Sequence, residues 1–117
     1  MANRYWVGGT GSWDGTAGSK WANSPGAVGG QSVPTSADSV FFDSNSTGTI
    51  TIATGNTGAG SINCTGFTGT LTGTASISVA GSVTLVAAMT YGRTGTLTIT
   101  GSGTLITPLL DVNVTGG

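Results

Sequence analysis

A short pentapeptide that alternates polar and apolar residues recurs along the chain, and it constrains the fold more than any other feature. Its form is Thr-Gly-Thr followed by Ile-Thr or Leu-Thr, and the copies begin at Thr47, Thr68 and Thr94. Alternation with a period of two predicts strands that bury one face, because successive side chains of a strand point to opposite sides. Glycine, serine and asparagine between the apolar residues predict tight turns. The expected structure is therefore a series of short strands joined by turns.

The regular recurrence of these copies favours a short, parallel β-helix-like solenoid, in which each copy belongs to a new coil. Each coil of a solenoid buries its apolar face against the next coil, so we expect Ile50, Leu71 and Leu97 to form one buried core column. Ile62 follows Ile50 by the same interval as Val83 follows Leu71, which predicts a second strand in each coil. A small β-sandwich or jelly roll also has short, evenly spaced strands, and it is the alternative all-β fold.

The composition agrees with an all-β chain. The 117 residues include 22 glycines, 22 threonines and 13 serines, but no glutamate and one lysine. Threonine, valine and isoleucine favour strands because their branched side chains fit a pleated surface, and strong helix formers are scarce. We therefore expect no helix longer than about three turns.

The sparse charges exclude several classes of function. Only seven residues are charged, and histidine is absent. A catalytic triad or zinc site that depends on histidine is therefore excluded. Three basic residues cannot form a groove that follows a phosphate backbone, so no nucleic-acid partner is expected. No apolar run approaches the roughly 20 residues of a membrane helix, so no membrane partner is expected either. The sequence also indicates no cofactor and no metal.

We expect a single domain, residues 1–117, made of two regions that differ in composition. Residues 1–46 hold all three tryptophans and five of the seven charges, and we interpret them as an aromatic N-terminal cap or docking region. Residues 47–117 contain no tryptophan and few charges and are repetitive, and we expect them to form the coils. No linker separates the two regions.

The N-terminal region resembles a recurrent module of phage and bacterial β-solenoid proteins. The resemblance rests on Arg-Tyr-Trp-Val-Gly-Gly-Thr-Gly-Ser-Trp-Asp at 4–14, Lys-Trp at 20–21, Val-Pro-Thr at 33–35 and Asp-Ser-Val-Phe-Phe-Asp at 38–43. It continues loosely through residues 62–71. Proteins of this kind include phage structural proteins and long surface adhesins, so the resemblance implies a solenoid with one of these two roles.

From this resemblance we expect a non-enzymatic structural protein of a bacteriophage particle, most simply a small capsid decoration (cement) or head-fibre protein. Its partners would be further copies of itself, with a homotrimer favoured, and a capsid or other virion protein. Residues 1–6 contain no apolar signal core, so we expect synthesis in the host cytoplasm and a place in the virion. The alternative is a fragment or short form of a surface adhesin, located outside the cell, that binds glycans. A polysaccharide-active enzyme is the weakest of the three hypotheses.

Two sets of residues are candidates for docking or for contact between subunits. The aromatic set is Tyr5, Trp6, Trp13, Trp21, Phe41 and Phe42. The apolar set near the C-terminal end of the sequence is Leu105, Leu109, Leu110, Val112 and Val114. Tryptophans are enriched at interfaces and stack on sugar rings, but their spacing here also fits a hydrophobic lid over the end of the solenoid. Both interpretations stay open from the sequence alone.

Few residues offer reactive chemistry. Asp38 and Asp43 could act as a glycosidic pair, but no other acid or base accompanies them, and capping of turns is the favoured role. Cys64 shares a strand face with Ile62 and has no histidine to activate it, so we interpret it as a small buried apolar residue.

Overall fold

The computed structural model describes residues 2–108 and 114–116, and within them every regular element is a strand. The strands are β1 (Asn3–Trp6), β2 (Gly11–Trp13), β3 (Trp21–Ala22), β4 (Ser39–Phe41), β5 (Thr49–Ile52), β6 (Ser61–Asn63), β7 (Thr70–Thr72), β8 (Ile77–Val79), β9 (Val83–Thr84), β10 (Thr90–Tyr91), β11 (Leu97–Ile99), β12 (Leu105–Ile106) and β13 (Val114–Gly116). The prediction of an all-β chain is confirmed.

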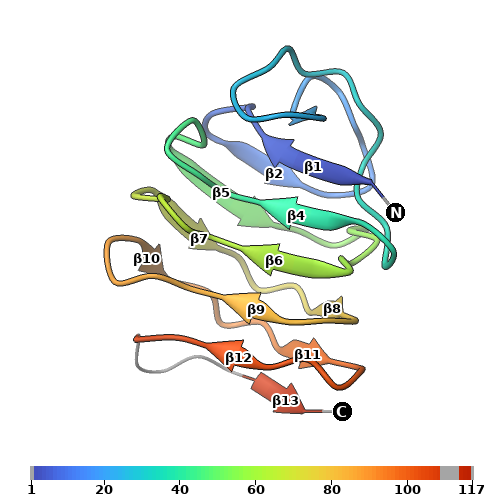
Figure 1. Cartoon of the computed structure of the whole chain (residues 1–117), viewed down its shortest axis with the longest axis vertical. Helices are drawn as coiled ribbons and strands as arrows, with labels where there is room; N and C mark the ends of the chain where they lie inside the picture. Colours follow the sequence, from blue (N-terminus) through green and yellow to red (C-terminus); the bar gives the residue numbers. More distant parts are fainter. Residues whose placement is uncertain (1, 109–113, 117) are drawn as a thin grey trace.

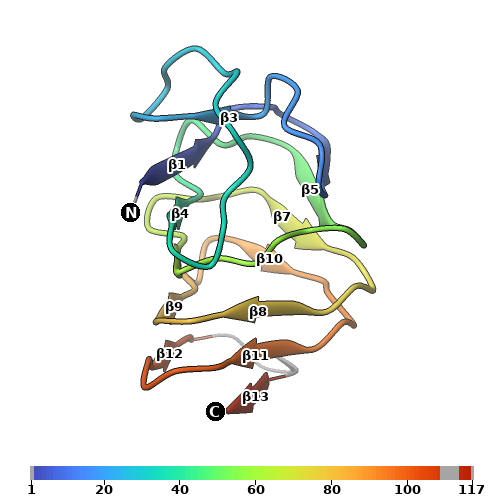
Figure 2. The ribbon, with the colours of Figure 1, turned by 90° about the vertical axis from the view of Figure 1, so that its right-hand side faces the viewer.

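The strands stack into a three-sided solenoid. The first sheet has the order β12-β9-β6-β4-β1-β3, the second has β10-β7-β5-β2, and the third has β13-β11-β8. Among the described strands, every pair is parallel except β1 with β3. From β7 to β12 the chain visits the second, third and first sheets in turn, and successive coils lie one beneath another (Figure 1). Figure 2 shows the third sheet face on, with β8, β11 and β13 as successive rungs.

Buried apolar residues stack in register inside the first sheet. Val40 pairs with Ile62, Ile62 with Val83, and Val83 with Leu105, so the chain returns to this sheet after a nearly constant interval. The first three of these side chains are buried and Leu105 packs partly against them. Ile62 and Val83, the apolar pair that follows the first two pentapeptides, therefore do mark a second strand in each coil.

The expected core column needs one correction. Ile50, Leu71 and Leu97 are all buried, and Ile50 lies in register with Leu71 in the second sheet. The next member of that column, however, is Tyr91, whereas Leu97 lies in the third sheet beside Ile77. A glycine followed by alternating threonine and leucine suits any corner that leads into a strand. The third pentapeptide therefore marks a corner one side further along the coil, which explains its longer spacing.

The N-terminal region closes one end of the solenoid. Strand β3 runs antiparallel to β1 and ends the first sheet there, with Trp6 in register with Trp21. In Figure 1 the long loop that follows β3 arches over this end. Phe42 and Phe67 connect the cap with the coils, at a distance of 5.6 Å between ring centroids. One buried apolar cluster thus runs from the cap into the coils.

Stacked glycines form the corner between the third sheet and the first. Gly60, Gly81 and Gly103 occupy equivalent places in successive coils, and each new coil brings its backbone against the preceding glycine. A Cβ atom on Gly81 would lie 2.5 Å from the carbonyl oxygen of Gly60. Real Cβ atoms do not approach backbone that closely, so this corner requires glycine for space.

We expect Gly81→Ala to lower the free energy of unfolding by about 1–3 kcal/mol, because the coils must separate locally to admit the methyl group. Gly92→Ala is the matched control, since its Cβ would find its nearest neighbour, the Leu71 carbonyl oxygen, at 3.8 Å. That change should be neutral or stabilising by up to about 1 kcal/mol. Denaturant unfolding of the two variants measures the difference, and equal stabilities would contradict the stacking of the corner.

Candidate functional site

The tryptophans proposed for docking lie in the core. Trp6, Trp13 and Trp21 have no exposed surface, and neither does Phe42. Trp21 meets the other two indoles edge to face, at centroid distances of 5.1 and 5.3 Å, and Trp6 Nε1 donates to the Gly9 carbonyl oxygen at 2.8 Å. The interpretation of these four residues as a docking surface or a sugar-stacking platform is therefore wrong for this structure. They form the lid, because their large rings fill the interior of the solenoid beneath the N-terminal cap.

Tyr5 and Phe41, the other two aromatic candidates, lie on the outer face. They are neighbours in register on β1 and β4, and their rings stack at 4.5 Å between centroids with an angle of 12° between planes. The same outward register continues through Asn63, Thr84 and Ile106. These five residues form what we call the outer column of the first sheet. Ile106 is 56% exposed, so the column offers an apolar group at each end.

The apolar set near the C-terminal end is only partly described. Leu105 is half-buried against the core. Leu109, Leu110 and Val112 lie outside the described residues. Val114 begins β13 and pairs with Leu97.

The two aspartates of the candidate glycosidic pair each serve their own turn. The Asp38 carboxylate accepts from the backbone N–H groups of Thr35 and Ala2, at 2.9 and 3.0 Å, and from the Thr35 hydroxyl at 3.2 Å. The Asp43 carboxylate accepts from the Asn45 N–H at 2.9 Å, two residues along the chain. This is the capping role that the sequence favoured.

Hydrogen bonding makes Asp38 a source of acid sensitivity. The Thr35 N–H lowers its pKa below the ordinary value of 3.8; partial burial opposes this shift, and the Ala2 N–H reinforces it. Because the unfolded chain binds the proton more readily, this stability is present above pH 3.8 and is lost as the pH falls through the folded pKa. We expect melting temperatures below pH 3.8 to fall less steeply in Asp38→Asn than in the wild type.

Some acid dependence should remain in that variant. The pKa of Asp14 is also lowered, mainly by the Thr16 N–H and the Lys20 ammonium, which lies 3.3 Å from the carboxylate. Asp14→Asn in the Asp38→Asn background should therefore flatten the profile further. Identical pH profiles for Asp38→Asn and the wild type would contradict the role assigned to Asp38.

Two further side chains that could in principle take part in chemistry, Cys64 and Arg93, are also buried in the core. Burial raises the pKa of the Cys64 thiol to about 12, which leaves it protonated and unreactive at neutral pH. Arg93, which the sequence did not single out, is only 4% exposed. Its guanidinium donates to the Tyr91 hydroxyl at 3.0 Å and to the Ala75 carbonyl oxygen, and so ties two coils together.

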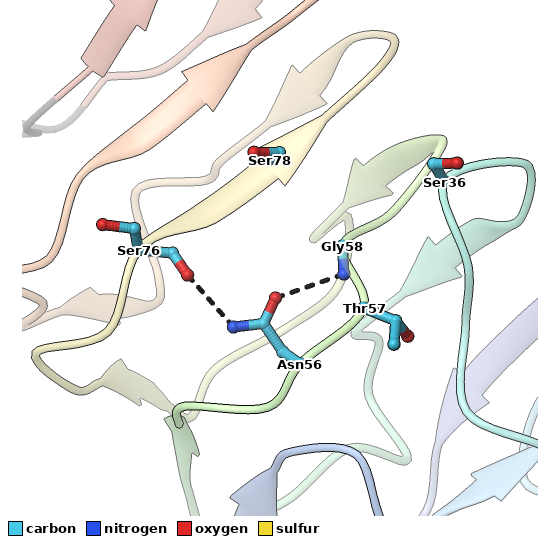
Figure 3. Close-up of a pocket in the computed structure, with 6 residues that line it drawn as sticks. All are labelled: Ser36, Asn56, Thr57, Gly58, Ser76 and Ser78. Carbon is cyan, nitrogen blue, oxygen red and sulfur yellow. Dashed lines mark hydrogen bonds between the residues drawn. The ribbon is translucent and has the colours of Figure 1, made fainter.

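A polar hollow lies at the start of the third sheet, and sequence analysis missed it. Its volume is about 310 Å³, and it is lined by Ser36, Asn56, Thr57, Gly58, Ser76 and Ser78. Figure 3 shows these residues on three separate segments of the chain. The Gly-Asn pair at 55–56 signals a turn, but nothing local in the sequence indicates that Ser36 would reach the same place.

Within the described residues, no three acidic, histidine or cysteine side chains gather to hold a metal ion, and no helix is present that could cross a membrane. Comparisons of the chain with protein-family models, with curated proteins and with solved structures found no match.

The fold itself defines the class of the protein, which is an all-β, three-sided parallel solenoid with an aromatic cap.

Proposed function

We propose that the chain is a non-enzymatic structural protein of a bacteriophage particle, a capsid decoration or head-fibre protein that acts as an oligomer. The observation that carries this proposal is the role of the motif residues. The tryptophans and Phe42, which carry the resemblance to phage solenoid modules, pack the cap. A motif that builds a rigid end for a solenoid suits a protein whose task is to present surfaces.

The state of the reactive groups supports the same proposal. Asp38 and Asp43 hold turns, and the Cys64 thiol is buried and protonated. These groups stabilise the fold. A structural protein needs a stable fold of this kind, because docking depends on the shape and stability of a surface more than on titratable side chains.

The outer column of the first sheet is the surface we assign to docking. It runs from the Tyr5–Phe41 ring pair to Ile106 along one straight side of the solenoid. Aromatic residues are enriched at interfaces because they bury a large area at little entropic cost. Asn63 and Thr84 between the ends can form hydrogen bonds across the same interface.

Light scattering of the purified chain tests self-association. We expect a multiple of the 11.4 kDa chain mass, with three copies the first choice. Ile106→Asp places a charge on the outer column, so it should shift the mass toward a single chain. Val28→Asp is the matched control, because Val28 is 89% exposed on the loop that follows β3. A wild-type chain that is monomeric at micromolar concentration would contradict the oligomer.

Mass spectrometry of purified phage particles tests whether the protein is part of the virion. A decoration protein should be present in many copies per particle and should remain bound through particle purification. Its absence from particles of a phage that encodes it would overturn the proposal, whatever the oligomeric state of the isolated chain.

A further inference from the structure

The hollow exists because the third sheet lacks a full strand in one coil. At the place where a strand would lie above β8, residues 53–58 form a loop. Only Ala59 continues the ladder, donating from its N–H to the Ser78 carbonyl oxygen at 3.1 Å and accepting from the Ala80 N–H at 2.9 Å. The edge of β8 that faces the loop therefore lacks a strand partner before Val79, and Ser76 and Ser78 point outward there on either side of the buried Ile77.

Asn56 holds this loop in place of the missing strand. Its Nδ2 donates to the Ala53 carbonyl oxygen at 2.9 Å. The same Nδ2 donates to the Ser76 carbonyl oxygen at 3.0 Å, and the Oδ1 accepts from the Gly58 N–H at 3.2 Å (Figure 3). Both hydrogens and the oxygen of the amide are thus engaged with the protein. Asn56 consequently shapes the hollow and leaves ligand contacts to other groups.

The groups free to meet a ligand are hydroxyls. Within the part of the chain that the structure describes, the hydroxyls of Ser36, Ser76 and Ser78 make no hydrogen bond. The Thr57 hydroxyl donates to the Pro34 carbonyl oxygen and keeps its acceptor lone pairs. Each of these oxygens can accept a hydrogen bond, and the three serines can also donate one.

None of the described residues that line the hollow is ionisable. The nearest carboxylate along the chain from Ser36 is that of Asp38, and it is engaged by Thr35 and Ala2. An anion or a cation would lose hydration here without gaining a counter-charge. A neutral molecule rich in hydroxyls would instead exchange its bonds to water for bonds of the same kind. The volume of about 310 Å³ lies at the lower end of the range for small-molecule sites.

We propose that this hollow is a binding subsite for a neutral carbohydrate, separate from the docking surface on the first sheet. No aromatic residue is among the described residues that line it, so binding relies on hydrogen bonds alone, and a single site should bind with a dissociation constant on the order of millimolar. Repetition of the chain in an oligomer would raise the effective affinity for a polymeric glycan without any new contact.

Titration of the ¹⁵N-labelled full chain with neutral trisaccharides tests the subsite, with maltotriose, mannotriose and triacetylchitotriose as the probes. At least one probe should shift the amide signals of Thr57, Gly58, Ser76 and Ser78 in a saturable manner. Sulfate, the charged probe, should shift none of them. The double variant Ser76→Ala with Ser78→Ala should weaken binding about tenfold, because two exposed hydroxyls are lost and the fold is unaffected.

Ser102→Ala is the control, since Ser102 is an exposed turn residue outside the hollow and its loss should leave the affinity unchanged. The proposal is overturned if none of the three sugars gives saturable shifts at the hollow, if sulfate shifts the same signals, or if the double variant binds as tightly as Ser102→Ala. None of these results bears on self-association or on presence in the particle, so failure here leaves the structural role standing.

Discussion

Leu71→Asp should leave the chain largely unfolded at 25 °C. Leu71 is 1% exposed and lies in register between Ile50 and Tyr91, so the new carboxylate would enter the interior of the solenoid without a partner. Loss of the leucine side chain alone costs about 2–5 kcal/mol, and burial of the unpaired charge adds to that figure. A domain of this size has a total stability of about 5–15 kcal/mol, so the sum is comparable with the whole.

Thr90→Asp is the control for this variant. Thr90 lies in the same sheet, next to Tyr91, but it is exposed, so the same charge stays in water. Its effect on the free energy of unfolding should lie within about 0.5 kcal/mol. Circular dichroism and thermal melting compare the two variants. A Leu71→Asp protein that melts within a few degrees of the wild type would show that Leu71 does not face the core.

Phe42→Ala should produce the second large effect, about 3–5 kcal/mol of destabilisation. The Phe42 ring has no exposed surface and lies between the cap and the coils, 5.6–6.4 Å from the rings of Phe67 and the three tryptophans. Its removal leaves a cavity that rigid indoles cannot collapse into. We also expect the near-ultraviolet circular dichroism of the tryptophans to weaken, because their mutual packing loosens.

The neighbouring residue provides the comparison. Phe41 points outward and stacks on Tyr5, so Phe41→Ala should cost less than about 1.5 kcal/mol and leave the tryptophan signal intact. Denaturant unfolding followed by tryptophan fluorescence measures both variants. If Phe41→Ala proves as costly as Phe42→Ala, the two side chains do not face opposite sides of the first sheet.

The periodic pattern was sufficient to predict strands and turns, and it favoured a solenoid over a small β-sandwich or jelly roll. Ile62 and Val83 each lie between two polar neighbours, and alternation with a period of two indicates a strand that buries one face. The roles of Asp38 and Cys64 also followed from residue type and local context, because a short carboxylate side chain beside a turn accepts from the free N–H groups of that turn. These are short-range properties, so the sequence carries them directly.

The sequence was a poorer guide to which sheet each strand belongs to. Leu97 was expected in the column of Ile50 and Leu71, yet it lies one sheet further along the coil. Identical pentapeptides can occupy different corners, and only the hydrogen-bonded register of neighbouring coils distinguishes them. The division of the aromatic residues was equally hidden, since Phe41 and Phe42 are adjacent in sequence and face opposite ways.

The sequence by itself thus determined the strands, the buried alternation and the caps of individual turns, because these depend on residues within a few positions of one another. Only the tertiary structure decided that three tryptophans fill one end of the solenoid and that Ser36, Asn56 and Ser76 surround one hollow. Those arrangements depend on which residue of one coil lies over which residue of the next. Coil length and corner geometry set that register across a whole turn of the solenoid, and no local pattern encodes it.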